Sequence, residues 1–396
     1  VPMNVDRNAD LQEESSLELS IVMPCLNEAQ TIGTCIDKAR SFVEKSGIRA
    51  EVIVADNGST DGSVEIAVQR GAIVEPVARP GYGAALNGGI ERARGRFVIF
   101  ADADDSFDFS DLMPLVDKLR EGHDLVIGDR FGGQIEEGAM PPMHRYVGNP
   151  ILSGIGRFLY KSPVQDFHCG LRGLSREIYP QLQLKSDGME FASEMIVKAT
   201  MLGMRIAEVP ITLYPDCRDR APHLRTWRDG WRHLRLMVIH SPRWLFFYPG
   251  LLTFLLGLFI VGWLFPGPRT VGAVTLDVHT MLYGAIMIIV GLQGVSFALF
   301  ASQFTANANL LPRDDGLMRL LGTITVERGV LLGLILFAVG LSGTLYAVLV
   351  WGDAGYGDLL PTQMMRLAIP SVTALACGAQ VVFISFFMGV LRLAEQ

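Results

Sequence analysis

The sequence predicts a two-part α/β and membrane protein: a domain with a mostly parallel sheet, followed by four transmembrane helices. Up to about residue 240, short Val- and Ile-rich runs alternate with amphipathic helical stretches, a pattern typical of strands that helices cover on both faces. Beyond that point, four windows have no Asp, Glu, Lys or Arg: 245–265, 280–302, 330–351 and 367–391. Each window is long enough to cross a bilayer core, which takes roughly 20 apolar residues.

The overall composition excludes several classes of protein. Of the 396 residues 49% are hydrophobic and only 19% are charged, whereas soluble domains are nearer a quarter charged. A purely soluble protein, a collagen, a disulfide scaffold and a disordered chain are therefore excluded. The net charge of −7 argues against a general nucleic-acid binder. Five scattered cysteines without a CxxC pair favour a reduced, cytosolic compartment.

The predicted elements follow in order. Residues 1–18 have no apolar segment, so they indicate a flexible lead-in and no signal peptide. The α/β domain is expected over 19–222, with strands at 19–24, 51–56, 72–77, 96–102, 124–130 and 205–214. Helices are expected between them, at 30–46, 62–70, 83–94, 111–121, 145–160 and 189–203. Because ligands of parallel sheets bind beyond the carboxyl ends of the strands, the polar residues that follow these runs predict a functional cleft.

Residues 223–243 predict an amphipathic helix that lies on the membrane surface. An apolar stripe of Trp227, Trp231, Leu234 and Val238 recurs at helical spacing, and arginines fall away from this stripe. The alternative is a helix packed on the core with a solvated arginine face.

Residues 244–396 are expected to form the four-helix membrane domain. Arginines are frequent before the first span and in the loop 303–329, whereas the two opposite loops carry only Arg269 and Arg366. The positive-inside tendency therefore places the N-terminal α/β domain and both termini in the cytoplasm of a multi-pass cell-membrane protein. Glycines within the spans suit close helix packing and leave room for a homo-oligomer interface.

The strongest chemical signal is Asp102-Ala103-Asp104, at the end of an apolar run. Two carboxylates at i and i+2 can approach one hard cation, and Mg²⁺ or Mn²⁺ prefers such oxygen ligands and takes others from a diphosphate. The alternative is a solvated acidic turn, because Asp105, Asp108 and Asp111 follow closely.

Three strand ends together, SIVMPCLNE, VIVADNGSTDG and FADADD, resemble the nucleotide-sugar-binding core of the family 2 glycosyltransferases. The resemblance implies the GT-A fold, with a Rossmann-like, mostly parallel sheet. It also implies that the nucleoside of the donor contacts Pro24, Asn27, Glu28 and Asp56. Asp102 and Asp104 would bind the donor and the metal, with Asp104 the more direct ligand, and Arg79 would lie near the phosphates.

A glycine-rich segment follows the third strand, ARPGYGAALNGG. A dinucleotide-binding GxGxxG motif is not satisfied, because Leu86 stands at the third glycine and the segment follows the third strand rather than the first.

A narrower resemblance comes from GDRF, the stretch Arg145–Asn149 and VQDFHCGLRGLSRE, together with four C-terminal spans. These features are similar to the polyprenyl-phosphate glycosyltransferases, relatives of the dolichol-phosphate-mannose and dolichol-phosphate-glucose synthases. The resemblance implies inverting transfer of a hexose from a nucleotide sugar to undecaprenyl or dolichyl phosphate. It gives the acceptor phosphate four residues, Arg130, Arg145, Asn149 and Arg172, and it places Asp166 near the transferred sugar, so that Asp104, Arg130 and Asp166 form the catalytic set. For Arg130 and Arg145 the alternative is a surface ion pair.

Three details remain open. Mannose-transferring members follow the two aspartates with Leu-Gln, whereas Asp105-Ser106 stands here; the resemblance therefore favours the glucose branch and UDP-glucose over GDP-mannose. The third metal ligand is left between Asp105, Ser106 and water. Glu190 and Glu194 either line the sugar pocket or face solvent.

Two rival functions remain. A processive polysaccharide synthase needs a QxxRW motif, but His240 stands where the glutamine before Arg243-Trp244 would be. A non-enzymatic membrane scaffold that binds nucleotide sugar would keep the nucleoside motifs and need no acceptor arginines.

Overall fold

The structure, a computed structural model, describes residues 17–217, 225–308, 325–353, 355–357 and 360–393. Nearly all of the predicted lead-in, the start of the segment 223–243 and most of the loop 303–329 lie outside these ranges. The chain divides into two compact units, one ending at Met237 and the next beginning at Val238. Each is described by itself.

Within the described residues, the first unit contains a seven-stranded sheet of order β3-β2-β1-β4-β6-β5-β7. Strand β6 is antiparallel to both β4 and β5, and the other neighbours are parallel. The strands are β1 (Leu19–Cys25), β2 (Ala50–Asp56), β3 (Ile73–Pro76), β4 (Phe97–Phe100), β5 (Leu125–Ile135), β6 (Arg172–Ser175) and β7 (Ile206–Leu213).

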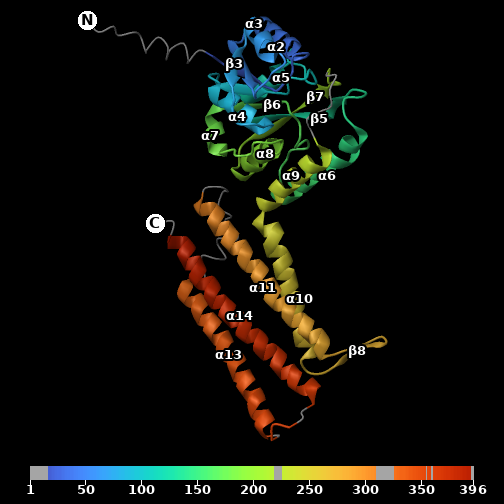
Figure 1. Ribbon diagram of the computed structural model, residues 1–396, viewed down its shortest axis with the longest axis vertical. Helices are drawn as coiled ribbons and strands as arrows, with labels where there is room; N and C mark the ends of the chain where they lie inside the picture. The colour runs from blue at the N-terminus through green and yellow to red at the C-terminus, as the bar shows by residue number, and fades with distance from the viewer. Residues whose placement is uncertain (1–16, 218–224, 309–324, 354, 358–359, 394–396) are drawn as a thin grey trace, which may run out of the picture. The chain divides into compact units, whose positions relative to one another are not determined.

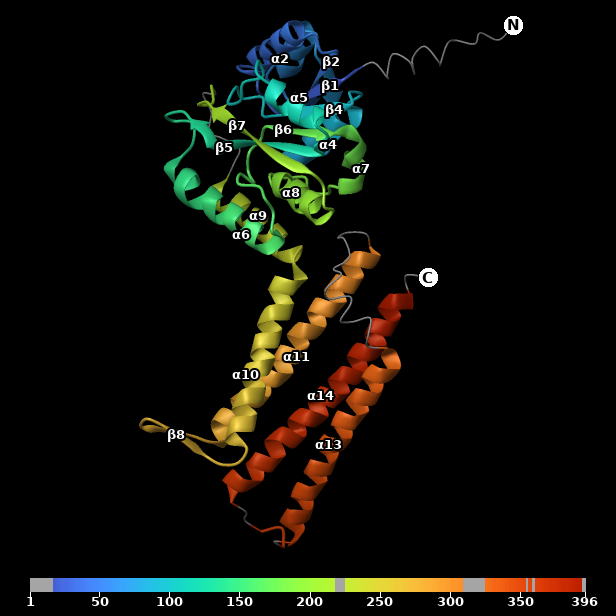
Figure 2. The same ribbon diagram turned by 180° about the vertical axis from the view of Figure 1, so that it is seen from behind.

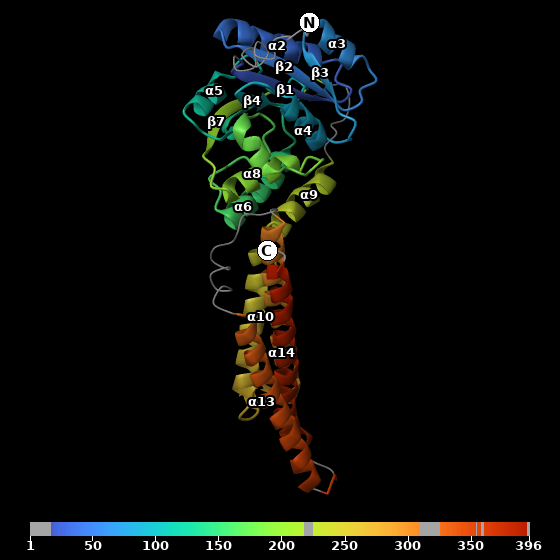
Figure 3. The same ribbon diagram turned by 90° about the vertical axis from the view of Figure 1, so that its left-hand side faces the viewer.

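Helices cover both faces of this sheet. Helices α2 and α3 lie on one side of β1–β3 and α4 lies on the other (Figure 3). Right-handed crossovers require this arrangement, because the chain runs from β1 through β2 to β3 at the edge and then returns past β1 to β4. The helices of the unit are α2 (Ile32–Ser46), α3 (Ser63–Gln69), α4 (Tyr82–Arg92), α5 (Met113–Arg120), η1 (His144–Gly148), α6 (Asn149–Tyr160), η2 (Arg176–Ile178), α7 (Tyr179–Leu182), α8 (Phe191–Met201) and α9 (Thr226–Ile239).

The strand register brings the predicted polar residues to one edge. Cys25 at the end of β1 lies opposite Asp56 at the end of β2, and Val22 lies opposite Phe100, the last residue of β4. The segment that follows β4 therefore emerges beside the last residues of β1. The central strands are buried almost throughout, which explains their continuous Val/Ile runs.

All six predicted strands and the helices between them are present, within a few residues of their expected bounds. The sequence analysis missed β6. Its four residues, RGLS, show neither alternation nor a β-branched run, and neighbouring strands on both sides hold it in the sheet.

The second unit has four helices that are long and apolar enough to cross a membrane, as far as the described residues show. They are α10 (Tyr248–Leu264), which continues the turn η3 (Arg243–Phe247), α11 (Val278–Asn307), α13 (Val326–Asp353) and α14 (Pro361–Leu393). Helices α10 and α11 run side by side, as do α13 and α14 (Figures 1 and 2). A hairpin of β8 (Arg269–Val271) and β9 (Val274–Leu276) connects α10 to α11.

Glycines make the close contacts between these helices. A Cβ at Gly257 would lie 2.6 Å from the Gly284 carbonyl, and one at Gly291 would lie 2.4 Å from the Phe254 nitrogen. Gly340 meets the backbone of α14 in the same way. These glycines therefore serve contacts within the chain, since they let backbones approach where any side chain would clash.

Polar contacts link α11 to α14. Asp277 accepts the Val278 N–H at the start of α11 and forms an ion pair with Arg366, and Gln380 donates to Gln293 farther along both helices. Such internal pairing satisfies side chains that lipid cannot hydrate.

Candidate active site

Hydrogen bonds join the loops that follow β1 and β2. Asn27 adopts a left-handed backbone (φ 59°); its N–H donates to Ser59 Oγ at 2.9 Å, and its side-chain oxygen accepts the Thr60 N–H at 2.8 Å. The Glu28 N–H donates to Ser63 Oγ at 2.8 Å. The carboxylate of Asp56 accepts backbone N–H groups of its own turn, at 3.0–3.2 Å. The predicted nucleoside residues therefore form one cross-linked wall.

Asn57 extends this wall, although the sequence analysis gave it no role in the site. Its amide nitrogen donates to the carbonyls of Val77 at 3.0 Å and Arg79 at 2.7 Å, and its oxygen accepts the Gly81 N–H at 2.7 Å. These three bonds attach the segment before α4 to the end of β2.

The two glycines at the start of α4 make room for the loop 186–190. A Cβ at Gly81 would lie 2.2 Å from the Asp187 carbonyl oxygen, and one at Gly83 would lie 2.2 Å from that of Ser186. The N–H groups of Gly83 and Ala84 donate to the Asp187 carbonyl at 2.8 and 3.3 Å. This N-terminus is thus capped by the chain itself.

Two ion pairs fix the same loop. Arg79, predicted to lie near phosphates, forms an exposed ion pair with Asp187 at 2.6 Å. The buried Glu194 pairs with Lys198 at 2.6 Å and accepts the N–H groups of Lys185 and Ser186. Burial opposes the ionisation of Glu194, but these partners outweigh it and lower its pKa. Glu194 therefore neither faces solvent nor lines the cavities described below.

Asp104 and Asp105 are neighbours in the loop after β4, but their carboxylates contact different groups. Asp104 is buried, and its Oδ1 accepts the N–H of Ser106 at 3.1 Å and its hydroxyl at 2.5 Å. Asp105 (φ 64°) instead pairs with Lys38 of α2 at 2.8 Å. The Asp105 carboxylate therefore pairs with α2 and does not share the surroundings of Asp104.

The donor set of Asp102 and Asp104 fits a hard divalent cation. Both are carboxylates at the same strand end, Asp104 is buried, and burial, with the charge of Asp102, raises the pKa of the neighbouring Tyr82 well above its usual value. Among the described residues no group of three or more His, Cys, Asp or Glu side chains is arranged to hold a metal. Mg²⁺ suits such a site, because it retains waters and takes ligands from substrate phosphates.

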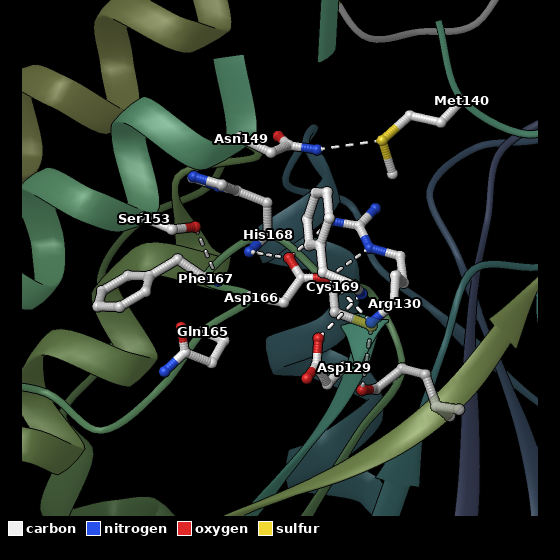
Figure 4. Close-up of polar contacts among 12 residues, drawn as sticks. Asp129, Arg130, Met140, Asn149, Ser153, Gln165, Asp166, Phe167, His168 and Cys169 are labelled. Atoms are coloured by element: carbon white, nitrogen blue, oxygen red, sulfur yellow. Dashed lines mark hydrogen bonds and ion pairs between the residues drawn. The ribbon is translucent and has the colours of Figure 1, made fainter. Parts of the chain in front are cut away.

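A buried bidentate ion pair joins β5 to the segment before β6. Arg130 Nε lies 2.6 Å from Asp166 Oδ2, and Arg130 Nη2 lies 2.8 Å from Asp166 Oδ1 (Figure 4). The two residues are 9% and 0% exposed. Burial opposes the charge of Arg130, but Asp166 outweighs it and raises the pKa of the guanidinium. The surface ion pair considered for Arg130 is thus a buried one, and Nη1 is the nitrogen that Asp166 does not engage.

Arg172 is the largest fully buried side chain. Its guanidinium donates to the carbonyls of Cys169, Ala192 and Phe167 at 2.9, 2.5 and 2.9 Å. These bonds hold the 167–169 segment against the start of α8. In the structure Arg172 thus supports the loop that carries Asp166, and its predicted contact with the acceptor phosphate stays a prediction.

The last two predicted acceptor residues lie near α6. Arg145 is half-buried in η1, with its guanidinium carbon 5.6 Å from the centre of the Tyr146 ring. Asn149 begins α6, and its amide donates to the Met140 sulfur at 3.5 Å. Asn149 lines the first cavity described next, whereas Arg145 is not part of its lining.

Two cavities of about 390 Å³ each lie at this edge of the sheet. The surface of the first is largely apolar, with Val147, Ile151, Leu152, Trp227, Trp231 and Leu234 in its wall, and its polar residues include Asp102, Asn149 and His168. The second is lined by Pro24, Glu28, Asn57 and Gly81, and by three arginines, one immediately before α9 and two on it. Tyr82, Met189 and Asp229 line both, so the two cavities adjoin.

Helix α9 packs on this unit through a face that the sequence did not predict. Asp229, His233 and Met237 are buried; Asp229 accepts the Arg225 N–H at 2.7 Å, and His233 Nδ1 lies 2.7 Å from Ser193 Oγ. Trp227 and Trp231 remain 80% and 59% exposed. The helix thus buries a stripe that carries Asp229 and His233, and its tryptophans remain exposed enough to contact lipid or another apolar ligand.

The imidazole of His168 has an enclosed Nε2 atom with no hydrogen-bond partner among the described residues. Its ring meets that of His233 edge to face, with centroids 4.6 Å apart. Burial, with His233 and Arg130, lowers its pKa well below the usual value, so the ring is neutral. A buried polar atom left unpaired is costly, and His168 lines the first cavity, so a hydrogen-bonding ligand there would relieve that cost.

Asn57, His168 and the three arginines at the start of α9 were therefore not predicted from the sequence as site residues. The arginine spacing i, i+3, i+7 was visible in the sequence, but it was interpreted as a solvated or membrane-facing helix surface. For His168 the sequence holds no signal, because its burial depends on contacts with α9.

Comparisons with known proteins agree with this architecture. The family described as "Glycosyl transferase family 2" matches residues 20–182, and "Glycosyltransferase family 2 C-terminal transmembrane region" matches residues 299–392. The low-salt glycan biosynthesis hexosyltransferase Agl6 of Haloferax volcanii is 35% identical over 372 residues, covering 94% of this chain and 88% of that protein. The dolichyl-phosphate hexose transferase of the same organism is 32% identical over 194 residues, covering 49% of this chain and 82% of that protein.

A solved structure is also similar. Glucosyl-3-phosphoglycerate synthase from Mycobacterium tuberculosis, in complex with Mn²⁺, uridine diphosphate and glucosyl-3-phosphoglycerate, matches with a TM-score of 0.44 and 25% identity, over 60% of this chain and 84% of its own. The relative that matches along almost the whole chain, and the two matched family regions, decide the assignment. The chain belongs to glycosyltransferase family 2 and is a membrane-associated glycosyltransferase.

Proposed function

We propose that this enzyme transfers a hexose from a nucleotide sugar to a polyprenyl phosphate, with inversion at the anomeric carbon. The two adjoining cavities carry the proposal: the second is lined by Pro24 and Glu28 of the predicted nucleoside residues, with Asn57 and three arginines, and the first is largely apolar with Asp102 in its wall. A donor in the second cavity and a lipid phosphate in the first would meet at the residues shared by both, Tyr82, Met189 and Asp229. A relative named as a dolichyl-phosphate hexose transferase supports the lipid acceptor.

The reaction needs alignment more than a strong base. A phosphate oxygen of the acceptor attacks the anomeric carbon, the bond from that carbon to the diphosphate oxygen breaks, and the nucleoside diphosphate leaves. The acceptor phosphate is already an anion at neutral pH, so catalysis consists of positioning and charge stabilisation. Asp102 and Asp104 would hold Mg²⁺ or Mn²⁺, which offsets negative charge on the leaving diphosphate.

The chain's own residues supply the rest. Arg130, with Nη1 left over from its pair with Asp166, and Arg145 contribute positive charge toward the acceptor phosphate. The apolar residues of the first cavity, with the exposed tryptophans of α9, suit the first isoprene units. Following the arginine distribution of the sequence, we place the catalytic unit and both termini on the cytoplasmic side of the membrane.

Glucose and UDP are the favoured sugar and nucleotide, because Asp105-Ser106 follows the two aspartates where mannose-transferring enzymes carry Leu-Gln. The test uses purified full-length protein with Mn²⁺ or Mg²⁺ and a short polyprenyl phosphate. UDP-glucose, UDP-galactose, UDP-GlcNAc and GDP-mannose, each labelled in the sugar, are supplied separately. We expect metal-dependent movement of label into the organic phase, and its loss in Asp104→Asn and Arg130→Gln. Nucleotide-sugar binding without transfer to any lipid phosphate would refute the acceptor.

A further inference from the structure

We propose that Arg225, which immediately precedes α9, together with Arg228 and Arg232 of α9, binds the diphosphate of the nucleotide-sugar donor; these three residues are called here the arginine face. The inference rests on the proposed function, since it gives the donor a further set of contacts. It assigns a binding role to residues that the sequence pattern had placed on a solvated or membrane surface.

The composition of the second cavity carries the argument. All three arginines line the same cavity as Pro24, Glu28 and Asn57, which are the residues at the ends of β1 and β2. The other ionisable side chains in its wall are acidic or weakly acidic: Glu28, Asp229, Tyr82 and Cys25. Without the arginines, this cavity would repel a diphosphate rather than bind it.

The orientation of the arginine face is fixed. Positions 225, 228 and 232 fall on one side of a helix, because residues three and four apart are neighbours on its surface. The buried stripe of Asp229, His233 and Met237 sets the rotation of α9 about its axis. Turning the arginines away would expose Met237 and break the bond of His233 with Ser193.

The usual alternative donors to a phosphate are already engaged. A helix N-terminus often binds phosphate, but in α4 the N–H groups of Gly83 and Ala84 donate to the Asp187 carbonyl. Arg79 is paired with Asp187 at 2.6 Å. Among the described residues, the positive charge that lines the second cavity comes from Arg225, just before α9, and from Arg228 and Arg232 on α9.

The three arginines differ in how far neighbouring carboxylates neutralise their charge. Arg232 Nη1 lies 4.0 Å from Glu190 and 3.8 Å from Asp229, so its charge is partly compensated. The guanidinium groups of Arg225 and Arg228 form no ion pair with a carboxylate in the described part of the chain, although the Arg225 backbone N–H donates to Asp229. A planar guanidinium that carries full charge binds phosphate oxygens in a bidentate manner, which makes Arg228 the sharpest position to test.

The chain offers a matched control on the same helix. Arg235 continues the series 225, 228, 232 at the next turn, is exposed, and does not line the cavity. Replacing it removes the same charge from the same helix face, two turns beyond Arg228. Any general effect of charge or of helix stability will therefore appear in both Arg228→Ala and Arg235→Ala.

The experiment measures equilibrium binding to purified full-length protein in detergent micelles with Mn²⁺, using UDP and uridine, with GDP and guanosine in parallel. In Arg228→Ala we expect the affinity for the bound diphosphate to fall roughly tenfold to a hundredfold, while the affinity for its nucleoside changes less than twofold. Arg228→Lys keeps the positive charge but not the bidentate guanidinium, so its affinity for the diphosphate should fall less than that of Arg228→Ala. Arg235→Ala stays within twofold for both ligands, and thermal unfolding confirms that each variant is folded.

Three results would overturn the inference. Equal weakening by Arg228→Ala and Arg235→Ala would reduce the effect to general electrostatics. Unchanged diphosphate binding in Arg228→Ala, with reduced binding to phosphatidylglycerol vesicles, would assign the face to anionic lipid and leave the proposed function intact. Absence of any nucleotide binding by the unaltered protein would overturn both proposals.

Discussion

Replacing Asp166 by asparagine should destabilise the catalytic unit severely, because it leaves the guanidinium of Arg130 buried without a counter-charge. The pair is bidentate, at 2.6 and 2.8 Å, and both residues are less than one-tenth exposed. Breaking a buried pair from one side costs about 3–5 kcal/mol. For a unit of this size each kcal/mol corresponds to roughly 2–4 °C, so we expect a fall in Tm of roughly 6–20 °C.

The chain contains an exposed pair of the same geometry as a control. Arg120 Nε and Nη2 lie 2.7 and 3.1 Å from the two carboxylate oxygens of Glu18, but the side chains are 41% and 32% exposed. Solvent screens such a pair to about 0–1 kcal/mol, so Glu18→Gln should lower Tm by less than about 4 °C. Thermal unfolding is followed with a thiol-reactive dye, because Cys25, Cys35 and Cys169 are buried in this unit.

A double-mutant cycle separates the pair from its surroundings. Arg130→Gln with Asp166→Asn should cost less than the sum of the single changes, by roughly 2 kcal/mol or more, since the double variant leaves no unpaired charge. If Asp166→Asn lowers Tm no more than Glu18→Gln does, burial does not control the energy of this pair and the reasoning is wrong.

Further predictions concern pH, metal dependence and packing. Burial lowers the pKa of His233 to about 4 from an unfolded value near 6.5, so the unfolded state binds more protons between these values. The unfolding free energy should therefore fall below about pH 6.5, and His233 contributes up to about 1.4 kcal/mol per pH unit to that slope. Because burial lowers the pKa of His168 as well, His233→Gln should reduce the slope by the share of His233 and leave that of His168, in unfolding measured from pH 8 to 4.5. Asp105→Asn should retain metal-dependent transfer, because Asp105 pairs with Lys38 of α2. Asp104→Asn should instead raise the Mn²⁺ concentration needed for half-maximal transfer roughly 10- to 100-fold. Equal losses for the two variants in a Mn²⁺ titration would contradict this. Gly83→Ala should destabilise the unit by about 1–3 kcal/mol, because its Cβ would lie 2.2 Å from a backbone carbonyl oxygen, whereas Gly154→Ala, with nothing within 4 Å, should not; similar Tm values for both would exclude the packing argument.

The sequence predicted the parallel part of the sheet well, because strands covered on both faces leave long Val/Ile runs that end abruptly in polar residues. Asp56, Asp102 and Asp104 could be placed at one edge for that reason alone. Strand β6 could not be predicted, since four residues held by neighbours on both sides need no pattern of their own.

Partnerships between distant residues were beyond the sequence. No local sequence pattern indicates that Arg130 pairs with Asp166, 36 residues away. Nor does one indicate that the Arg172 guanidinium donates to three backbone carbonyls. Helix α9 shows the same limit. Its tryptophan stripe was visible, but the burial of Asp229 and His233 depends on partners that become apparent only in three dimensions.

The glycines of the membrane helices dictate where these segments tolerate a change of length. The close contacts recur at an interval of seven residues, at Gly250 and Gly257, at Gly284 and Gly291, and at Gly333 and Gly340. Seven residues are almost two full turns, whereas one inserted or deleted residue rotates everything beyond it by about 100°. A single insertion between two such glycines would swing a bulky side chain into the neighbouring backbone, but the same insertion outside them would merely lengthen a helix end.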